Sequence, residues 1–121
     1  MRVLLVDDDQ LMTRMYERKF QFEGHDIVVV DNGRSGLELL EDDKSFDVIL
    51  LDVMMPEMNG FEFLEAKQKM ENAKDIPVIM LTNLVGSEDD EKKGINLGAK
   101  EYLVKSRLQP NDIVEAAKKY V

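Results

Sequence analysis

The chain has 121 residues, of which 44% are hydrophobic and 34% charged, an ordinary composition for one globular domain. It contains no cysteine, which excludes disulfides, thiolate metal sites and cysteine nucleophiles. No apolar run approaches the roughly 18 residues of a membrane span, and no signal peptide opens the chain, so we expect a cytoplasmic protein without membrane contact.

The charge is strongly negative and unevenly distributed. The formal net charge is −9, which would repel phosphate backbones, so direct binding of nucleic acid is not expected. Residues 1–60 carry 14 acidic and 6 basic side chains, whereas residues 61–121 carry 11 and 10. The first half therefore concentrates carboxylates, and their positions suggest a site.

Short apolar runs alternate along the chain with longer amphipathic segments. In chain order, the pattern predicts strands at 3–6, 27–30, 48–51, 78–81 and, shorter, 102–104. Helices are predicted between and after them, over 11–20, 35–40, 61–70 and 111–121, the last with Pro110 in its first turn. The helix before the last strand is predicted to run from an N-cap at Ser87 to about Leu97. Continuous apolar strands are typical of parallel sheets that are covered on both faces. The alternation predicts a single doubly wound α/β domain over residues 1–121, with helices on both faces of a five-stranded sheet.

Polar side chains follow four of the predicted strands. Asp7 and Asp8 come after the first strand, Asp52 after the third, Thr82 after the fourth and Lys105 after the fifth. In doubly wound sheets the carboxyl ends of the strands form the functional crevice, so we expect these groups to converge.

Crowded carboxylates are costly without a cation, because each raises the pKa of the others. Carboxylates, carbonyls and water suit Mg²⁺, whereas no cluster of His or Cys is present to hold zinc. A carboxylate nucleophile beside Mg²⁺ and a lysine is typical of phosphoryl transfer, with Asp52 becoming an aspartyl phosphate. Thr82 could donate its hydroxyl to a phosphoryl oxygen, and Lys105 would act as a point charge.

Two neighbouring polar residues have simpler interpretations. Asp9 precedes a predicted helix and is expected to act as its N-cap. His25, the only histidine, stands at the start of a strand, at the end of the sheet opposite the acidic residues, so a structural role is expected.

At this point the chain resembles the receiver domains of response regulators, the CheY-like domains of two-component signalling, over essentially its whole length. The motifs that carry the resemblance are Val3–Asp8, Leu51–Gly60, Leu81–Thr82 and Gly98–Lys105, in family order and spacing. The resemblance implies the strand order 2-1-3-4-5. It also implies that Asp52 is the phosphoacceptor.

The resemblance implies further roles around Asp52. Asp8 and Asp52 would bind Mg²⁺ directly, together with the backbone carbonyl of Met54, and Asp7 would act mostly through water. Thr82 would be the switch hydroxyl, Tyr102 the aromatic side chain that changes rotamer with it, and Lys105 the lysine that contacts the phosphate.

The resemblance also implies partners. Phosphate would come from a sensor histidine kinase or a phosphotransfer protein. A surface formed by the fourth helix, the fifth strand and the fifth helix would then control a downstream protein. The domain would be a switch rather than an enzyme, and either a monomer or a dimer that forms on phosphorylation. Any effect on DNA would pass through another protein.

The chain departs from the family pattern in places that bear on the chemistry. Ser106 follows Lys105 where the family usually has a cis-proline, so this peptide is either trans or a strained cis bond. Asn83 follows Thr82 where a smaller residue is usual, and its bulk could shield the acyl phosphate. Met54 and Leu84 are apolar at positions that influence water attack, which predicts slow autodephosphorylation.

Three alternatives remain. The segment 5–9 also resembles the Asp-x-Asp motif of haloacid-dehalogenase-type phosphatases, with Asp7 as nucleophile and Asp9 as general acid, although the acidic pair expected after the lysine is missing. A flavin-binding domain of the same topology would need a phosphate loop rich in glycine and hydroxyl groups where this chain has aspartates. A degenerate receiver that only binds partners would not need the complete acidic set.

Overall fold

The computed structural model describes residues 1–43, 45–83 and 88–121, in which five strands alternate with five α-helices. The strands are β1 (Arg2–Val6), β2 (Asp26–Val30), β3 (Val48–Asp52), β4 (Val78–Thr82) and β5 (Glu101–Val104). The helices are α1 (Gln10–Phe22), α2 (Gly33–Asp42), α3 (Gly60–Gln68), α4 (Glu88–Asn96) and α5 (Pro110–Lys118), and a short 3₁₀ helix (Lys105–Arg107) follows β5. Each predicted strand is confirmed and is one residue longer than its apolar run.

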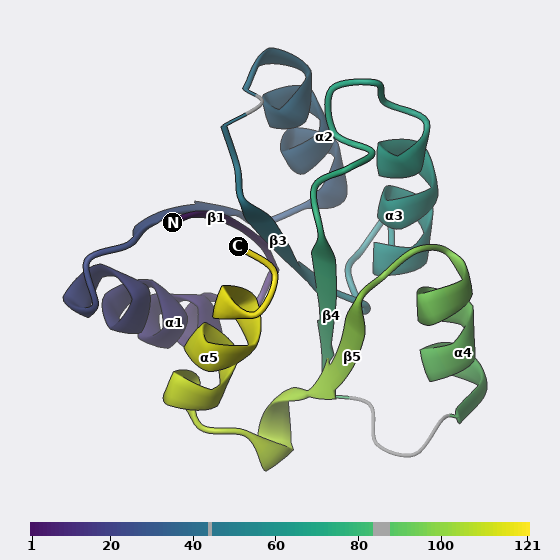
Figure 1. Ribbon diagram of the computed structural model, residues 1–121. Helices are drawn as coiled ribbons and strands as arrows, with labels where there is room; N and C mark the ends of the chain where they lie inside the picture. The colour runs from purple at the N-terminus through teal and green to yellow at the C-terminus, as the bar shows by residue number, and fades with distance from the viewer. Residues whose placement is uncertain (44, 84–87) are drawn as a thin grey trace.

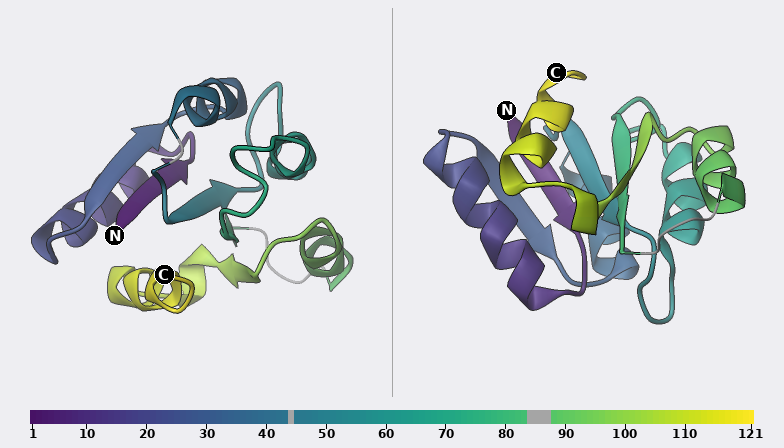
Figure 2. Two further views of the ribbon diagram at one scale, coloured as in Figure 1. Left: turned by 45° about the horizontal axis from the view of Figure 1, so that its top comes forward. Right: turned by 90° about the horizontal axis from the view of Figure 1, so that it is seen from below.

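The five strands form one parallel sheet in the order β2-β1-β3-β4-β5, which confirms the predicted topology. Helices α1 and α5 cover one face of the sheet, and α2, α3 and α4 cover the other (Figure 1, Figure 2). Every residue of β3 and β4 is buried, whereas the edge strands β2 and β5 are half-buried. Uninterrupted apolar runs suit central strands that face a helix layer on both sides.

Alternate residues of each strand supply two hydrophobic cores, one on each face of the sheet. On the face of α1 and α5, the core includes Tyr16, Phe20, Ile113 and Val114. On the other face, it includes Leu40, Phe61, Phe63 and Leu64. This packing holds the carboxyl ends of the strands in a fixed register, which positions the site.

Helix α2 begins earlier and ends later than the predicted segment 35–40. Asn32 is its N-cap, and its side chain accepts a hydrogen bond from the backbone N–H of Ser35 at 2.8 Å. Gly33 and Gly36 weaken the helical signal in the sequence, but the fold requires small residues there. A Cβ at Gly33 would lie 2.8 Å from Sδ of Met58, so a larger side chain would separate α2 from the loop after β3.

Helix α4 is the least apolar helix, as its sequence predicts. Gly94 is the only buried residue among the described residues of this helix, and Glu88, Asp89, Asp90 and Glu91 form its first turn. The predicted N-cap Ser87 lies outside the described residues. Pro110 occupies the first turn of α5, as predicted. None of the helices in the described ranges is long and apolar enough to span a membrane.

The first turn of α1 depends on Asp9. Its Oδ1 accepts hydrogen bonds from the backbone N–H groups of Leu11 and Met12, both at 3.1 Å, which confirms the predicted N-cap. These bonds satisfy two of the donors that a helix leaves unpaired at its start.

Replacing Asp9 with alanine should therefore lower the free energy of unfolding by about 1 kcal/mol. Asp9→Asn keeps the capping oxygen and should retain most of the stability, as measured by urea unfolding. An equal loss in the two variants would show that charge, rather than capping, is what Asp9 contributes.

Candidate functional site

The carboxyl edge of the sheet collects the polar residues that the sequence singled out. Asp52 and Thr82 are the last residues of β3 and β4, and Lys105 is the first residue after β5. Asp7, Asp52, Thr82 and Lys105 are 1%, 5%, 0% and 2% exposed, whereas Asp8 is exposed. Four buried polar groups at one edge of a small sheet are expensive unless they satisfy one another.

The three aspartates form one cluster. One carboxylate oxygen each of Asp7, Asp8 and Asp52 lies within 4.8 Å of the other two. The backbone places them there, because β1 and β3 are neighbours and Val6 pairs with Leu51 directly before the acidic residues. The predicted convergence of these carboxylates is confirmed in geometry, while their roles in metal binding stay predictions.

Lys105 reaches this cluster from the end of the edge strand β5, at the same carboxyl edge of the sheet. Its Nζ donates a short hydrogen bond to Oδ2 of Asp7 and lies 3.5 Å from Oδ1 of Asp52. The other oxygen of Asp7 accepts from the backbone N–H of Asp9 at 2.9 Å. Lys105 is therefore tied to Asp7 more closely than to Asp52. No peptide bond within the described residues is cis, so the bond between Lys105 and Ser106 is trans.

Burial changes the acidity of Asp52. It raises the pKa of Asp52 to about 7, and the neighbouring carboxylate of Asp7 acts in the same direction. The ammonium of Lys105 opposes the rise. In the absence of a cation, Asp52 thus holds its proton near neutral pH far more tightly than an exposed aspartate does.

Tyr16 of α1 lies close enough to the acidic cluster for its pKa to respond to the same negative charges. Burial raises the pKa of its phenol to about 12, and Asp7, Asp9 and Asp52 contribute further. The helical spacing indicates only that Tyr16 belongs to the core. The sequence carries no signal that its ring would pack beside the acidic cluster.

Thr82 and Tyr102 lie on the neighbouring strands β4 and β5. Thr82 is completely buried, and Tyr102 is half-buried on the edge strand. Burial raises the pKa of the Tyr102 phenol, Asp90 of α4 adds to this effect, and the side chain of Thr82 opposes it. The structure thus brings the two predicted switch residues together, and their switching stays a prediction.

The loop after β3 folds back over the end of that strand. Gly60 begins α3, and its backbone N–H donates to the carbonyl of Val53 at 2.9 Å. A Cβ at position 60 would collide with the backbone oxygen of Asp52, so only glycine allows this approach. Glu57 has a φ of 67°, an unusual value for a residue with a side chain, in the tight turn before α3.

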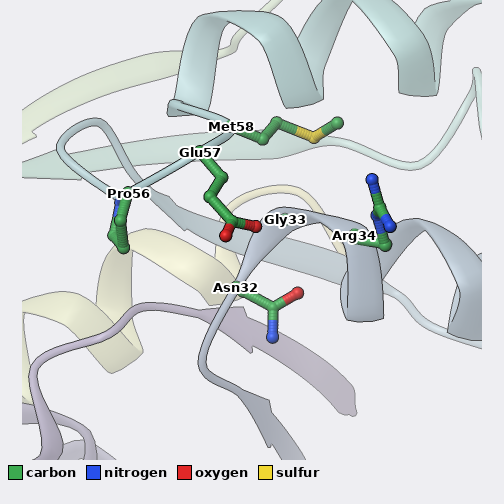
Figure 3. Close-up of a pocket in the computed structure, with 6 residues that line it drawn as sticks. All are labelled: Asn32, Gly33, Arg34, Pro56, Glu57 and Met58. Atoms are coloured by element: carbon green, nitrogen blue, oxygen red, sulfur yellow. The ribbon is translucent and has the colours of Figure 1, made fainter.

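This loop and the start of α2 enclose a cavity of about 90 Å³ that is lined by Asn32, Gly33, Arg34, Pro56, Glu57 and Met58. In Figure 3 the Glu57 carboxylate points toward Gly33, and the Met58 side chain extends along the top of the cavity. The cavity is smaller than typical ligand sites, because the loop packs closely against the start of α2.

Met54 stands in the same loop, two residues after Asp52, and is 60% exposed. An apolar residue is therefore available to solvent close in sequence to Asp52, and its influence on water attack stays a prediction. Asn83, directly after Thr82, is exposed. Leu84, the other residue expected to influence water attack, lies outside the described residues. The predicted metal contact of the Met54 carbonyl stays a prediction.

The donor set fits a hard divalent cation. All the side-chain donors of the cluster are carboxylate oxygens, which Mg²⁺ and Mn²⁺ prefer. When all three carboxylates are ionised, the single ammonium among the described side chains of the site leaves two negative charges without a counter-charge. A divalent cation held by Asp7, Asp8 and Asp52 would balance them.

The phosphatase alternative does not fit this geometry. It requires Asp9 as a general acid, but Oδ1 of Asp9 caps α1 by accepting two backbone hydrogen bonds. It also leaves the buried Asp52 without a role, and Asp7 is already paired with Lys105. Nothing in the described residues favours this alternative.

His25 lies at the opposite end of the sheet, as expected. Its Nδ1 lies 3.2 Å from the N-terminal amine, and its ring packs edge-on against Phe20 with centroids 6.2 Å apart. A structural role at this end accounts for the only histidine.

Together these features place the chain among the doubly wound α/β domains that gather an oxygen-only cation site, a buried threonine and a buried lysine at the carboxyl edge. A family model described as the response regulator receiver domain matches residues 3–118, and the chain belongs to this family. It is thus a receiver domain of the kind found in two-component systems.

Individual relatives agree with this assignment. The chain is 43% identical over 104 residues to the transcriptional regulatory protein CpxR of Escherichia coli K12, a match that covers 86% of this chain and 42% of CpxR. The chain thus spans less than half the length of this relative. Among solved structures, Vibrio cholerae chemotaxis protein CheY4 superposes with a TM-score of 0.90 at 32% identity, covering 99% of this chain and 98% of CheY4.

A second similar structure contains a metal. The Mn²⁺-bound form of response regulator Rcp1 superposes with a TM-score of 0.79 at 25% identity, covering 98% of this chain and 89% of the other.

Because a proton and a cation compete for Asp52, Mg²⁺ affinity should depend on pH. With the pKa of Asp52 raised to about 7, the proton must leave before the cation binds. The apparent affinity should fall by about tenfold for each pH unit below 7 and level off above about pH 8.

Calorimetric Mg²⁺ titrations in two buffers of different ionisation enthalpy would measure this linkage. Close to one proton should be released per bound Mg²⁺ at pH 6, and almost none at pH 8.5. Equal affinity and no proton release at both pH values would contradict the raised pKa.

Proposed function

We propose that Asp52 accepts a phosphoryl group from the phosphohistidine of a sensor histidine kinase or a phosphotransfer protein. The observation that carries this proposal is the position of Asp52, a buried carboxylate flanked by two further carboxylates and by the ammonium of Lys105. Membership of the receiver family, which implies a kinase partner, supports it.

In the proposed reaction an oxygen of Asp52 attacks phosphorus. The P–N bond to the donor imidazole breaks, its electron pair returns to the ring nitrogen, which takes up a proton, and a P–O bond forms to give an acyl phosphate. A divalent cation at the acidic cluster would supply positive charge to the phosphoryl oxygens when bound. The Mn²⁺-bound form of Rcp1 supports such a cation in this family.

The side chains around Asp52 suit this step. Lys105 holds an ammonium 3.5 Å from the Asp52 carboxylate, where it can meet a phosphoryl oxygen without moving far. Thr82, at the end of the adjacent strand, carries a hydroxyl that can donate to another oxygen. The ion pair with Asp7 holds the Lys105 ammonium in position beside Asp52.

The proposed output is a change in the surface formed by α4, β5 and α5. Tyr102 of β5 is adjacent to Thr82 and also interacts electrostatically with Asp90 of α4, so it connects the site with that surface. In this proposal the domain is a switch rather than an enzyme, and its oligomeric state, monomer or dimer formed on phosphorylation, is set by the same surface.

The downstream partner is proposed to be a DNA-binding domain. CpxR is a transcriptional regulatory protein, which supports an effect on transcription. The net charge of −9 disfavours contact between this domain and DNA, so the proposed regulation passes through another domain or protein.

Mass spectrometry after incubation with acetyl phosphate and Mg²⁺ tests the phosphoacceptor. The unmodified sequence should gain one phosphoryl group, and Asp52→Asn should gain none because the nucleophilic carboxylate is lost. Asp26→Asn, the same change on an exposed residue at the other end of the sheet, should be labelled normally. Equal labelling of Asp52→Asn and the unmodified chain would place the acceptor elsewhere.

The acyl phosphate should be long-lived, stable for many minutes without a phosphatase. The exposed Met54 side chain cannot orient a water molecule for attack. Met54→Asn, which offers an amide to water, should shorten the lifetime by roughly tenfold, whereas Met54→Leu should leave it unchanged. The lifetime follows from the loss of the phosphoryl adduct with time, and decay of the unmodified chain within seconds would rule out this account.

A further inference from the structure

A buried lysine outside the acidic site uses every donor that it has. Lys67, in the last turn of α3, is 2% exposed. Its Nζ donates to the backbone carbonyls of Ile76 at 2.5 Å and Lys74 at 3.0 Å, and to Oε1 of Gln68 at 3.2 Å. An ammonium has three donors and no acceptor, so these three bonds exhaust it. The two carbonyls belong to the segment that leads into β4.

The donor-only character of Lys67 fixes the orientation of Gln68. With its oxygen turned toward the ammonium, the amide must present its nitrogen on the other side. Nε2 of Gln68 accordingly donates to the backbone carbonyl of Leu97 at 2.9 Å, directly after the end of α4. Gly98 has a φ of +109°, and a Cβ there would collide with this amide nitrogen, so the glycine leaves room for the bond.

Other contacts of this end of α4 lie close by. The ammonium of Lys93 lies 4.6 Å from the centroid of the Phe61 ring. Gly94 packs so closely on the sheet that a Cβ would lie 2.7 Å from Sδ of Met80. In the first turn of α4, Glu88, Asp89 and Glu91 are exposed, whereas Asp90 is half-buried and interacts electrostatically with Tyr102.

The hydrogen bond of Gln68 borders open space on one side, while the Leu97 side chain packs against the hydrophobic core. A cleft of about 420 Å³, lined by Glu65, Gln68, Lys69, Asn96 and Leu97, separates the ends of α3 and α4 beside it. The two helices lie next to each other along one face of the sheet (Figure 1). Across this cleft, the Gln68 bond is a direct link between α3 and the end of α4, in addition to the packing of Leu97 and Gly94 on the core.

From this arrangement we propose that the chain of hydrogen bonds from Lys67 through Gln68 to Leu97 anchors the C-terminal end of α4. The helix then pivots about this anchor when the domain switches, so that its acidic N-terminal turn moves and its C-terminal turn stays in place. The proposal rests on the proposed function, because phosphorylation of Asp52 is the event that moves the helix.

Amide hydrogen exchange, read separately for residues 88–92 and 95–99, tests the anchor. The test uses the unmodified chain, Gln68→Glu and the control Glu65→Gln, each with and without acetyl phosphate and Mg²⁺. Gln68→Glu keeps an oxygen for Lys67 but cannot donate to Leu97. Glu65→Gln alters charge in the same cleft and leaves the bond intact.

In the unmodified chain, phosphorylation should change exchange at 88–92 and leave 95–99 within about twofold. Before phosphorylation, Gln68→Glu should already speed exchange at 95–99 by about tenfold, and phosphorylation should then change exchange there as well. Glu65→Gln should behave like the unmodified chain.

Two results would overturn the anchor. One is equal exchange at 95–99 in Gln68→Glu and Glu65→Gln before phosphorylation. The other is a phosphorylation response at 95–99 of the unmodified chain as large as that at 88–92. If mass spectrometry shows no phosphoryl adduct, the proposed function fails instead, and the exchange of the unphosphorylated variants still decides whether Gln68 holds the end of α4.

Discussion

The structure depends on how three carboxylates are kept together at one edge of a buried sheet. Like charges at this separation repel strongly where the surroundings are poorly solvated, so the fold must supply compensation. Lys105 gives one positive charge, placed against Asp7 and within 3.5 Å of Asp52. The negative charge that Lys105 does not balance raises the pKa of Asp52, which burial and the neighbouring carboxylate of Asp7 bring to about 7. The site is thus built with a deficit of positive charge.

That deficit makes the site responsive. A group whose folded pKa lies above its unfolded value stabilises the fold when protonated, and this contribution is lost as pH rises from about 4 to about 7. At neutral pH the ionised cluster therefore costs stability, which a bound cation would restore by mass action. Under the proposed function, a phosphoryl group on Asp52 would add negative charge and change the same balance. Lys105 and Thr82, the side chains nearest to this charge, would then be expected to rearrange.

The sequence was sufficient to predict the sheet and the location of the site. The central strands are uninterrupted apolar runs, and parallel strands bring their carboxyl ends to one edge, so Asp7, Asp52 and Lys105 could be placed together without coordinates. Helix α2 was predicted too short because its glycines serve close packing rather than a turn.

Contacts between distant segments could not be predicted in this way. That Lys105 pairs mainly with Asp7 depends on the detailed path of the chain after β5. The burial of Lys67 is likewise not indicated by the sequence, because lysine is usually exposed and its three acceptors come from a loop and a neighbouring side chain. Tyr16 looks like any core aromatic residue until the acidic cluster is placed beside it. These relations arise only when the elements are packed.

Strand β4 links the two polar networks of the molecule. Its last residue, Thr82, belongs to the acidic site, whereas the segment before its first residue is held through the carbonyl of Ile76 by Lys67. Because the amino end of β4 is held in this way, the proposed rearrangement at the carboxyl edge would have little freedom to travel along the strand as a rigid shift. It would act instead on the elements that border the same edge, Tyr102 on β5 and the first turn of α4. In this proposal, the held amino end and the negatively charged carboxyl end of β4 would together confine the change to one edge of the sheet.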